Sequence, residues 1–138
     1  MKCIKNKHLY IYYLLVQTLH LVMLITIFVG GFEKYLPYLS TDLLPSQILL
    51  LGISGFIDLF FSTPLGIIGS ILALRSEKKR KVLAISVIFL WASALIYELA
   101  LLINYPTRIF SVNLVFHILF LPVVLLSYRI VKKIINHR

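Results

Sequence analysis

A few side chains with acid–base chemistry stand inside long apolar stretches of this chain. They are two imidazoles, two carboxylic acids and one amide: His20, Asp58, Glu98, Asn113 and His117. Ionisable groups are costly to place in an apolar environment, so they face the interior of a protein and take partners there. The pattern predicts a buried polar site that binds protons or a group of a partner.

The same donors are of the kinds that bind metal ions, but their spacing does not favour a metal site. Zinc sites on helices pair their ligands at short, regular spacings, and no H-x-x-x-H or E-x-x-H pair occurs here. Haem ligation by His20 and His117 needs open space that their bulky neighbours do not offer. Cys3 is the only cysteine, which excludes an internal disulfide or a cysteine zinc site. Metal and haem are therefore the less favoured alternatives.

Composition places these residues in a membrane protein. Hydrophobic residues make up 60% of the 138 residues and charged residues only 14%, whereas soluble domains carry about 25% charged residues. A soluble enzyme, a secreted disulfide scaffold and a disordered tail are thereby excluded. The apolar residues form four runs, each long enough to cross a bilayer as a helix, at about residues 9–29, 48–74, 82–103 and 109–131. We predict an all-α fold, an integral membrane four-helix bundle that forms a single domain over residues 1–138.

Basic residues set the predicted orientation. Twelve of the 14 Lys and Arg residues lie in the N-terminal arm, in the loop 75–81 or at the C-terminal end, and only Lys34 and Arg108 lie on the other side. Cytoplasmic segments carry such an excess, so we expect both termini in the cytoplasm, an antiparallel up-down-up-down order and a location in the cell membrane. Anchoring explains the positive charge without a nucleic-acid partner. The apolar, proline-containing segment 31–47 is predicted to lie at the outer interface.

Small and polar residues recur at every fourth position of the second predicted span. This stripe comprises Ser54, Asp58, Ser62, Gly66 and Ser70. Small residues at this spacing let helices approach closely, so the acid of the stripe should face the bundle interior and not lipid. We expect Asp58 to hydrogen-bond to His20, to His117 or to a carbonyl freed near Pro64, which should kink the helix. Its role is either structural or that of a group that binds and releases a proton.

Two short motifs carry a resemblance to a known family. The segment from Gly30 to Pro37 (GGFEKYLP), followed by Leu44-Pro45, resembles the end of the first span in DoxX-like four-helix membrane proteins. The segment Gly55-Phe56-Ile57-Asp58 stands where the second span of that family opens with Gly-x-x-Glu. The resemblance implies that Asp58 takes the place of the buried acid of the family. It also implies a relation to subunits of membrane redox systems, including thiosulfate–quinone oxidoreductases, with a quinone as the cofactor to consider.

Two classes of function follow from these observations. The first is a small membrane subunit or accessory protein of a larger, quinone- or redox-linked complex, with no catalytic activity of its own, because no phosphate-binding loop or nucleophile motif is present. The alternative is a small proton-coupled exporter that acts as a homo-oligomer, similar in size to the small multidrug resistance family. A bacteriocin-immunity type of interaction protein is a third class, for which the sequence carries no mark.

Overall fold

The structure, a computed structural model, describes residues 7–30 and 43–103 and single positions between 118 and 136. Every regular element among these residues is helical. These residues form four α-helices, a π-helix (η1) and a 3-10 turn (η2). In chain order the elements are α1 (Lys7–Gly30), α3 (Pro45–Ile57), η1 (Asp58–Ser62), α4 (Thr63–Arg75), η2 (Glu77–Lys79) and α5 (Lys81–Ile103).

Three of the described helical stretches have the length and composition to cross a membrane. They are α1 with 24 residues, the continuous stretch Pro45–Arg75 with 31 residues, and the stretch Glu77–Ile103 with 27 residues. The predicted all-helical fold is therefore confirmed for the described residues, with three long apolar helices compatible with a membrane bundle. Most of the predicted fourth span, 109–131, and most of the predicted interfacial segment, 31–47, lie outside the described residues.

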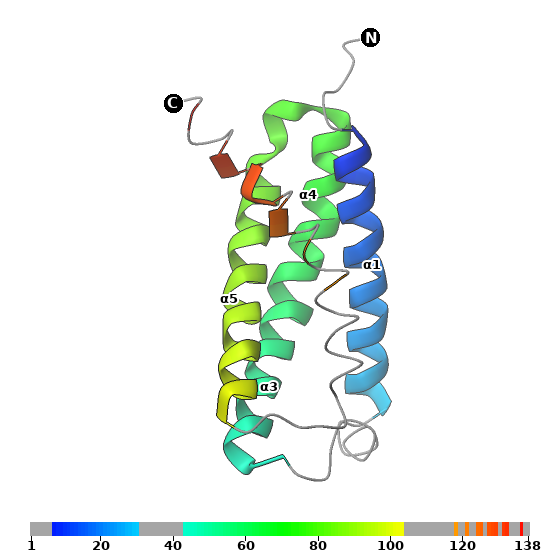
Figure 1. Ribbon diagram of the computed structural model, residues 1–138. Helices are drawn as coiled ribbons and strands as arrows, with labels where there is room; N and C mark the ends of the chain where they lie inside the picture. The colour runs from blue at the N-terminus through cyan, green and yellow to red at the C-terminus, as the bar shows by residue number, and fades with distance from the viewer. Residues whose placement is uncertain are drawn as a thin grey trace.

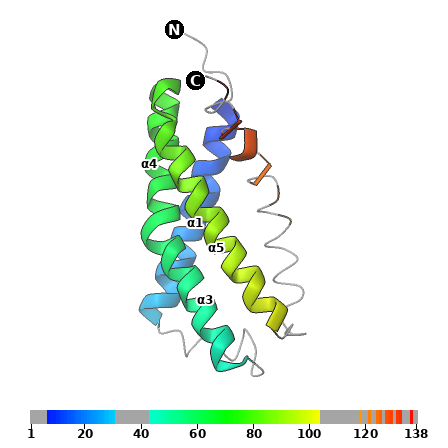
Figure 2. The ribbon, with the colours of Figure 1, turned by 90° about the vertical axis from the view of Figure 1, so that its left-hand side faces the viewer.

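The second helical stretch occupies the centre of the arrangement. Helix α1 packs against α4 and touches η1, whereas α3 and α4 both pack against α5, so the long rods stand side by side (Figure 1). Viewed from the side, α3 leans away from the direction of α4, and the two meet at η1 (Figure 2). Because η2 is a short turn, α5 runs antiparallel to α4.

One end of the arrangement collects positive charge, and we call it the basic end. The start of α1 and the turn between α4 and α5 both lie there (Figure 1). These segments carry Lys7, Arg75, Lys78, Lys79, Arg80 and Lys81. The described basic residues of the long helices and their connecting turn are thus gathered at one end.

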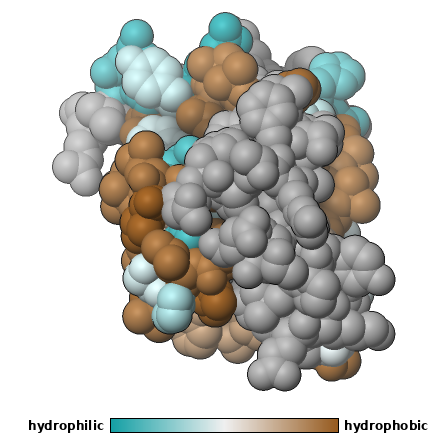
Figure 3. Space-filling model, turned by 60° about the horizontal axis from the view of Figure 1, so that its bottom comes forward, coloured by the Kyte–Doolittle hydropathy of each residue, from teal (hydrophilic) through white to brown (hydrophobic). Residues whose placement is uncertain are grey.

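The outer surface of the helices is apolar. Large side chains such as Leu19, Val29 and Leu102 are more than two-thirds exposed. Brown, apolar groups dominate the described surface in Figure 3, and most teal groups lie along its upper edge. The interior by contrast holds ten buried polar side chains beside nine buried hydrophobic ones among the described residues. This inside-to-outside pattern fits contact with lipid, because polar groups in lipid must be satisfied within the protein.

The π-helix explains why the whole predicted stripe faces inward. Ser54, Asp58, Ser62, Gly66 and Ser70 are all buried. In an α-helix of 3.6 residues per turn, positions four apart drift steadily around the helix. The wider turn of a π-helix offsets this drift at Asp58–Ser62, so both halves of the stripe stay on one face.

Pro64 accounts for the place of this irregularity. Proline has no backbone N–H, so the regular bond from residue 64 to the carbonyl of residue 60 is lost. The backbone N–H of Thr63 bonds instead to the carbonyl of Asp58, five residues earlier, and the Thr63 hydroxyl donates to the same oxygen at 2.8 Å. The kink expected at Pro64 thus takes the form of a π-helix just before it.

Two glycines of the second stretch offer a matched test of the close packing. A Cβ atom added at Gly69 would lie 2.7 Å from the backbone nitrogen of Leu83 and 2.8 Å from its Cα, whereas one added at Gly52 would meet no atom within 4 Å. We expect Gly69→Ala to lower the free energy of unfolding by about 1–3 kcal/mol, because backbone must shift to admit the methyl group. Reversible unfolding in mixed detergent micelles, followed by circular dichroism, measures this change.

Gly52→Ala is the control, and it should be neutral or stabilising by up to about 1 kcal/mol because alanine favours the helix. Equal stability of the two variants would contradict the close contact between α4 and α5.

Candidate functional site

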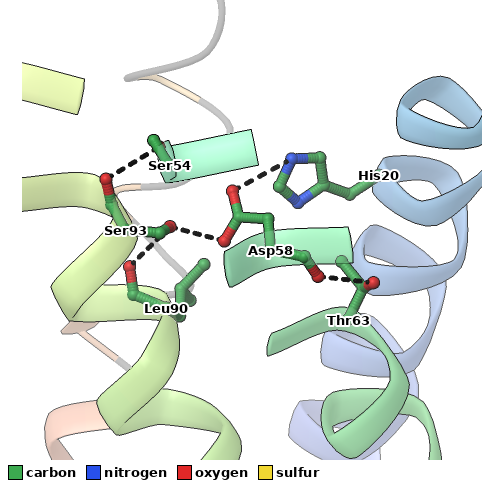
Figure 4. A network of polar contacts seen from close by, with 6 residues as sticks. All are labelled: His20, Ser54, Asp58, Thr63, Leu90 and Ser93. Carbon is green, nitrogen blue, oxygen red and sulfur yellow. Dashed lines mark hydrogen bonds and ion pairs between the residues drawn. The ribbon is translucent and has the colours of Figure 1, made fainter. Parts of the chain in front are cut away.

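The carboxyl group of Asp58 lies at the centre of a network that joins three helices (Figure 4). Asp58 is the first residue of η1, near the middle of the 31-residue stretch, and it is only 8% exposed. The Ser93 hydroxyl of α5 donates a hydrogen bond to Oδ1. Nε2 of His20 on α1 lies 3.5 Å from Oδ2. Both carboxyl oxygens therefore face polar partners inside the bundle.

His20 belongs to the inward face of α1. Tyr10, Tyr13, Gln17 and Leu24 are the buried residues of that helix, and His20 falls at the same three- and four-residue spacing, with its side chain 9% exposed. The 3.5 Å separation from Asp58 suits an ion pair but is long for a hydrogen bond. A proton passed directly between the two groups thus requires a small approach of α1 to η1.

Ser93 ties the carboxyl group to two backbone carbonyls. Its hydroxyl also lies 3.2 Å from the carbonyl oxygen of Leu90, one turn earlier on α5. The carbonyl of Ser93 in turn accepts a hydrogen bond of 2.9 Å from the hydroxyl of Ser54 on α3. Ser54 thus joins α3 to α5 at Ser93. Ser93, the donor to Asp58, is therefore in contact with both η1 and α3.

A second polar layer lies nearer the basic end. The Ser86 hydroxyl of α5 donates to the carbonyl of Ser62 at 2.8 Å, and the Tyr13 hydroxyl lies 3.1 Å from the oxygen of Ser86. Since the single proton of Ser86 is used on Ser62, Tyr13 is the donor in its contact with Ser86. The layer links α1, η1 and α5 between the carboxyl group and the basic end.

A third polar contact lies at the opposite end of α3. The amide nitrogen of Gln47 donates to the carbonyl of Ala100 at 2.9 Å, and its amide oxygen accepts from the backbone N–H of Leu44 at 3.0 Å. Gln47 therefore caps the start of α3 and joins it to the end of α5.

The predicted site residues divide into three groups. Asp58 and His20 come together, as described above. Glu98 lies on an exposed face of α5, so its grouping with the buried acid is corrected: it follows Ser93 by five residues, which turns it well away from the inward face. Asn113 and His117 lie outside the described residues.

Sequence reasoning missed Ser93, Ser86 and Tyr13 as members of the network. A signal for the two serines was present, because positions seven apart share one face of a helix, and both stand in an otherwise apolar run. The side chain of Tyr13 is fully buried.

Within the described part of the chain, no three His, Cys, Asp or Glu side chains come close enough together to hold a metal ion. The cluster around Asp58 supplies one carboxyl group and one imidazole. Its chemistry is that of an acid–base pair: each group accepts or releases a proton, and the serine hydroxyl orients the acid.

Comparisons of the chain with protein-family models, with curated proteins and with solved structures found no match.

Removal of the Ser93 hydroxyl tests the network. We expect Ser93→Ala to lower the free energy of unfolding by about 1–3 kcal/mol, because a buried carboxyl oxygen loses its donor. Thr18→Val is the matched control: Thr18 is exposed and, within the described part of the chain, its hydroxyl bonds to the carbonyl of Leu14 in its own helix, so a change within about 0.5 kcal/mol is expected. The unfolding assay in mixed micelles compares the two. A Ser93→Ala protein as stable as the parent would show that this hydrogen bond does not hold α5 to η1.

Proposed function

We propose that the chain is a multi-pass protein of the cell membrane that serves as an accessory subunit of a larger membrane complex, with Asp58 and His20 as a proton-exchanging pair. The observation that carries the proposal is the carboxyl group held between His20 and Ser93 in the middle of the bundle. An ionisable residue at such depth is expensive to maintain, which is why it marks a functional site.

The accessory role is supported by what surrounds the pair. The described residues form little besides the long apolar helices, whose outer faces expose many large hydrophobic side chains. Such faces pack against lipid or against other membrane helices. The resemblance to DoxX-like proteins supports the same class, since that family is similar to subunits of membrane redox systems.

A quinone does not fit the described cluster itself. A quinone carbonyl needs hydrogen-bond donors, and the Ser93 hydroxyl and Nε2 of His20 are both directed at Asp58. In a redox-linked complex the partner would therefore hold the quinone, and this chain would contribute a group that binds protons.

A proton-coupled exporter remains the second candidate because of one specific observation. The acid stands at the break between α3 and α4, where the π-helix interrupts the second stretch. Interrupted helices commonly build the central sites of transporters. Such an exporter would assemble as a homo-oligomer and release its proton when a cationic substrate binds.

Affinity purification separates these two candidates. We expect a tagged chain, extracted from native membranes in mild detergent, to co-purify with a larger membrane protein, because an accessory subunit binds its complex through its apolar faces. Mass spectrometry of the eluate identifies the companion. Recovery of this chain alone, as a homo-oligomer that releases protons on adding a lipophilic cation, would favour the exporter and reject the accessory role.

Cysteine labelling tests the proposed orientation, with the basic end in the cytoplasm. In a Cys3→Ser background, we expect Ser76→Cys to react with a membrane-impermeant maleimide only after permeabilisation, and Ser40→Cys to react in intact cells. Ser76 ends α4 beside the basic turn, and such charge stays in the cytoplasm. Labelling of Ser76→Cys in intact cells would show that the basic end lies outside the cytoplasm and would contradict the proposed orientation.

Infrared spectroscopy of the purified protein tests proton binding by Asp58. With aspartate labelled by carbon-13, we expect the carbonyl band of a protonated carboxyl group to appear and vanish with pH. Asp58→Asn should fold and lack this band, because the amide keeps the shape and the hydrogen bonding but does not titrate. Asp42→Asn, which alters the only other aspartate, is the control and should keep the band. A pH-dependent band that persists in Asp58→Asn would contradict the proposal that Asp58 exchanges protons.

A further inference from the structure

Buried polar atoms without a hydrogen-bond partner are unevenly distributed along the bundle. Among the described residues they include both amide atoms of Gln17 and the hydroxyl oxygens of Ser62 and Ser70. All three side chains are fully buried. The Gln17 amide approaches the Tyr13 hydroxyl, yet neither of its polar atoms is in hydrogen-bond geometry. These atoms all lie between Asp58 and the basic end.

On the other side of Asp58 the buried polar side chains of the described helices have hydrogen-bond partners. Ser54 donates to the carbonyl of Ser93, and Gln47 bonds to Ala100 and Leu44 through its two amide atoms. The remaining buried residues of that half include Leu24, Ala100 and Leu101, which are apolar. Among the described residues, the side of Asp58 away from the basic end therefore presents hydrogen-bonded polar groups and hydrocarbon.

Gly66 marks the place where α1, α4 and α5 approach one another most closely beside Gln17. A Cβ atom added there would lie 2.9 Å from Cγ of Gln17, 2.9 Å from the hydroxyl oxygen of Ser86 and 3.0 Å from the ring of Tyr13. Residues of α1, α4 and α5 thus meet around one position without a side chain. Gly66 lies eight residues after Asp58, in the direction of the basic end.

Unsatisfied buried polar atoms in a native protein call for an explanation, and bound water is the usual one. A glutamine amide alone offers two donors and two acceptor sites, and leaving them empty would be strongly destabilising. Water molecules bonded to Gln17, Ser62 and Ser70 would satisfy these groups and would also line up between the acid and the basic end.

Tyr10 continues this line to the end of the bundle. It lies on the same face of α1 as Tyr13 and Gln17, and it is close to Glu77 and Arg80 of the basic turn. Among the described residues, the titratable groups that face Asp58 are His20 and, one layer further, Tyr13, both on α1. Helix α5 contributes Ser93, which does not titrate, and α3 and α4 contribute serine and threonine.

We propose that water bound among Gln17, Ser62 and Ser70 forms a proton pathway that connects Asp58 to the basic end only. The inference rests on the proposed proton-exchanging role of the acid. It adds the side from which that proton comes and the residues along its route.

One-sided pH jumps on reconstituted vesicles test the pathway. The full chain is placed in phosphatidylcholine vesicles, its orientation is read from maleimide labelling of Ser76→Cys, and the infrared band of carbon-13-labelled Asp58 is followed in time. We expect rapid protonation when the pH changes on the side of the basic end, and a response slower by at least tenfold from the other side. Equal rates from both sides, or a faster response from the opposite side, would overturn the pathway while leaving the acid–base role of Asp58 intact. A band that does not respond to pH at all would reject the proposed function itself.

Two variants test the residues of the route. Gln17→Met keeps nearly the same side-chain length and removes the amide, and Ser70→Ala makes a smaller change that the fold tolerates more readily. We expect each to slow protonation from the basic end by roughly tenfold, the rate effect of one lost hydrogen-bonding group, with no change in the final band intensity. Thr18→Val, on the exposed face of α1, is the control and should leave the rate unchanged. Unchanged rates in both route variants would overturn the assignment of Gln17 and Ser70.

Discussion

The need to satisfy a buried carboxyl group within a bundle of long apolar helices governs the arrangement of this protein. In lipid the hydrophobic effect gives helices little reason to associate, so close packing and polar contacts must hold them together. Asp58 faces Ser93 of α5 through one oxygen and His20 of α1 through the other. One side chain thereby fixes the position of two helices against the central one. An unpaired acid there would cost several kcal/mol of folding free energy. Helix packing arrangements that separate these groups are therefore disfavoured.

The π-helix makes this constraint compatible with close packing. Gly66 and Gly69 hold α4 against its neighbours, with almost no space for a Cβ atom, and Ser54 holds α3 against α5. A regular α-helix would rotate the polar residues of one half away from those of the other. The wider turn at Asp58–Ser62 removes that conflict, so the acid sits at the point where both halves face inward.

The sequence predicted the helices and the inward face of the acid because both depend on local patterns. Long apolar runs define helices that span a membrane, and a spacing of four residues defines a face. His20 was one of three partners expected for Asp58, and the choice among them depends on how the helices pack. Ser93 was not foreseen as the donor to Asp58: its spacing of seven from Ser86 places the two serines on one face of α5, but only the crossing of α5 with η1 shows that this face meets the acid. Pro64 indicated a break in the helix but not that a π-helix would form there. Glu98 was grouped with the acid by its charge, and only the register of α5 shows it on another face.

The pairing with His20 decides what the acid does beyond packing. A carboxyl and an imidazole that share one proton are neutral as a pair, whichever of the two groups holds it. A second proton would leave a net positive charge in the apolar interior, which only bound water or a nearby counter-charge stabilises. Net proton exchange at Asp58 therefore requires a hydrated approach on at least one side, whereas a purely structural acid requires none. The unsatisfied groups of Gln17, Ser62 and Ser70 lie on one side of the pair only. They are difficult to explain if Asp58 served packing alone, since apolar side chains at these positions would leave no buried polar atom unsatisfied.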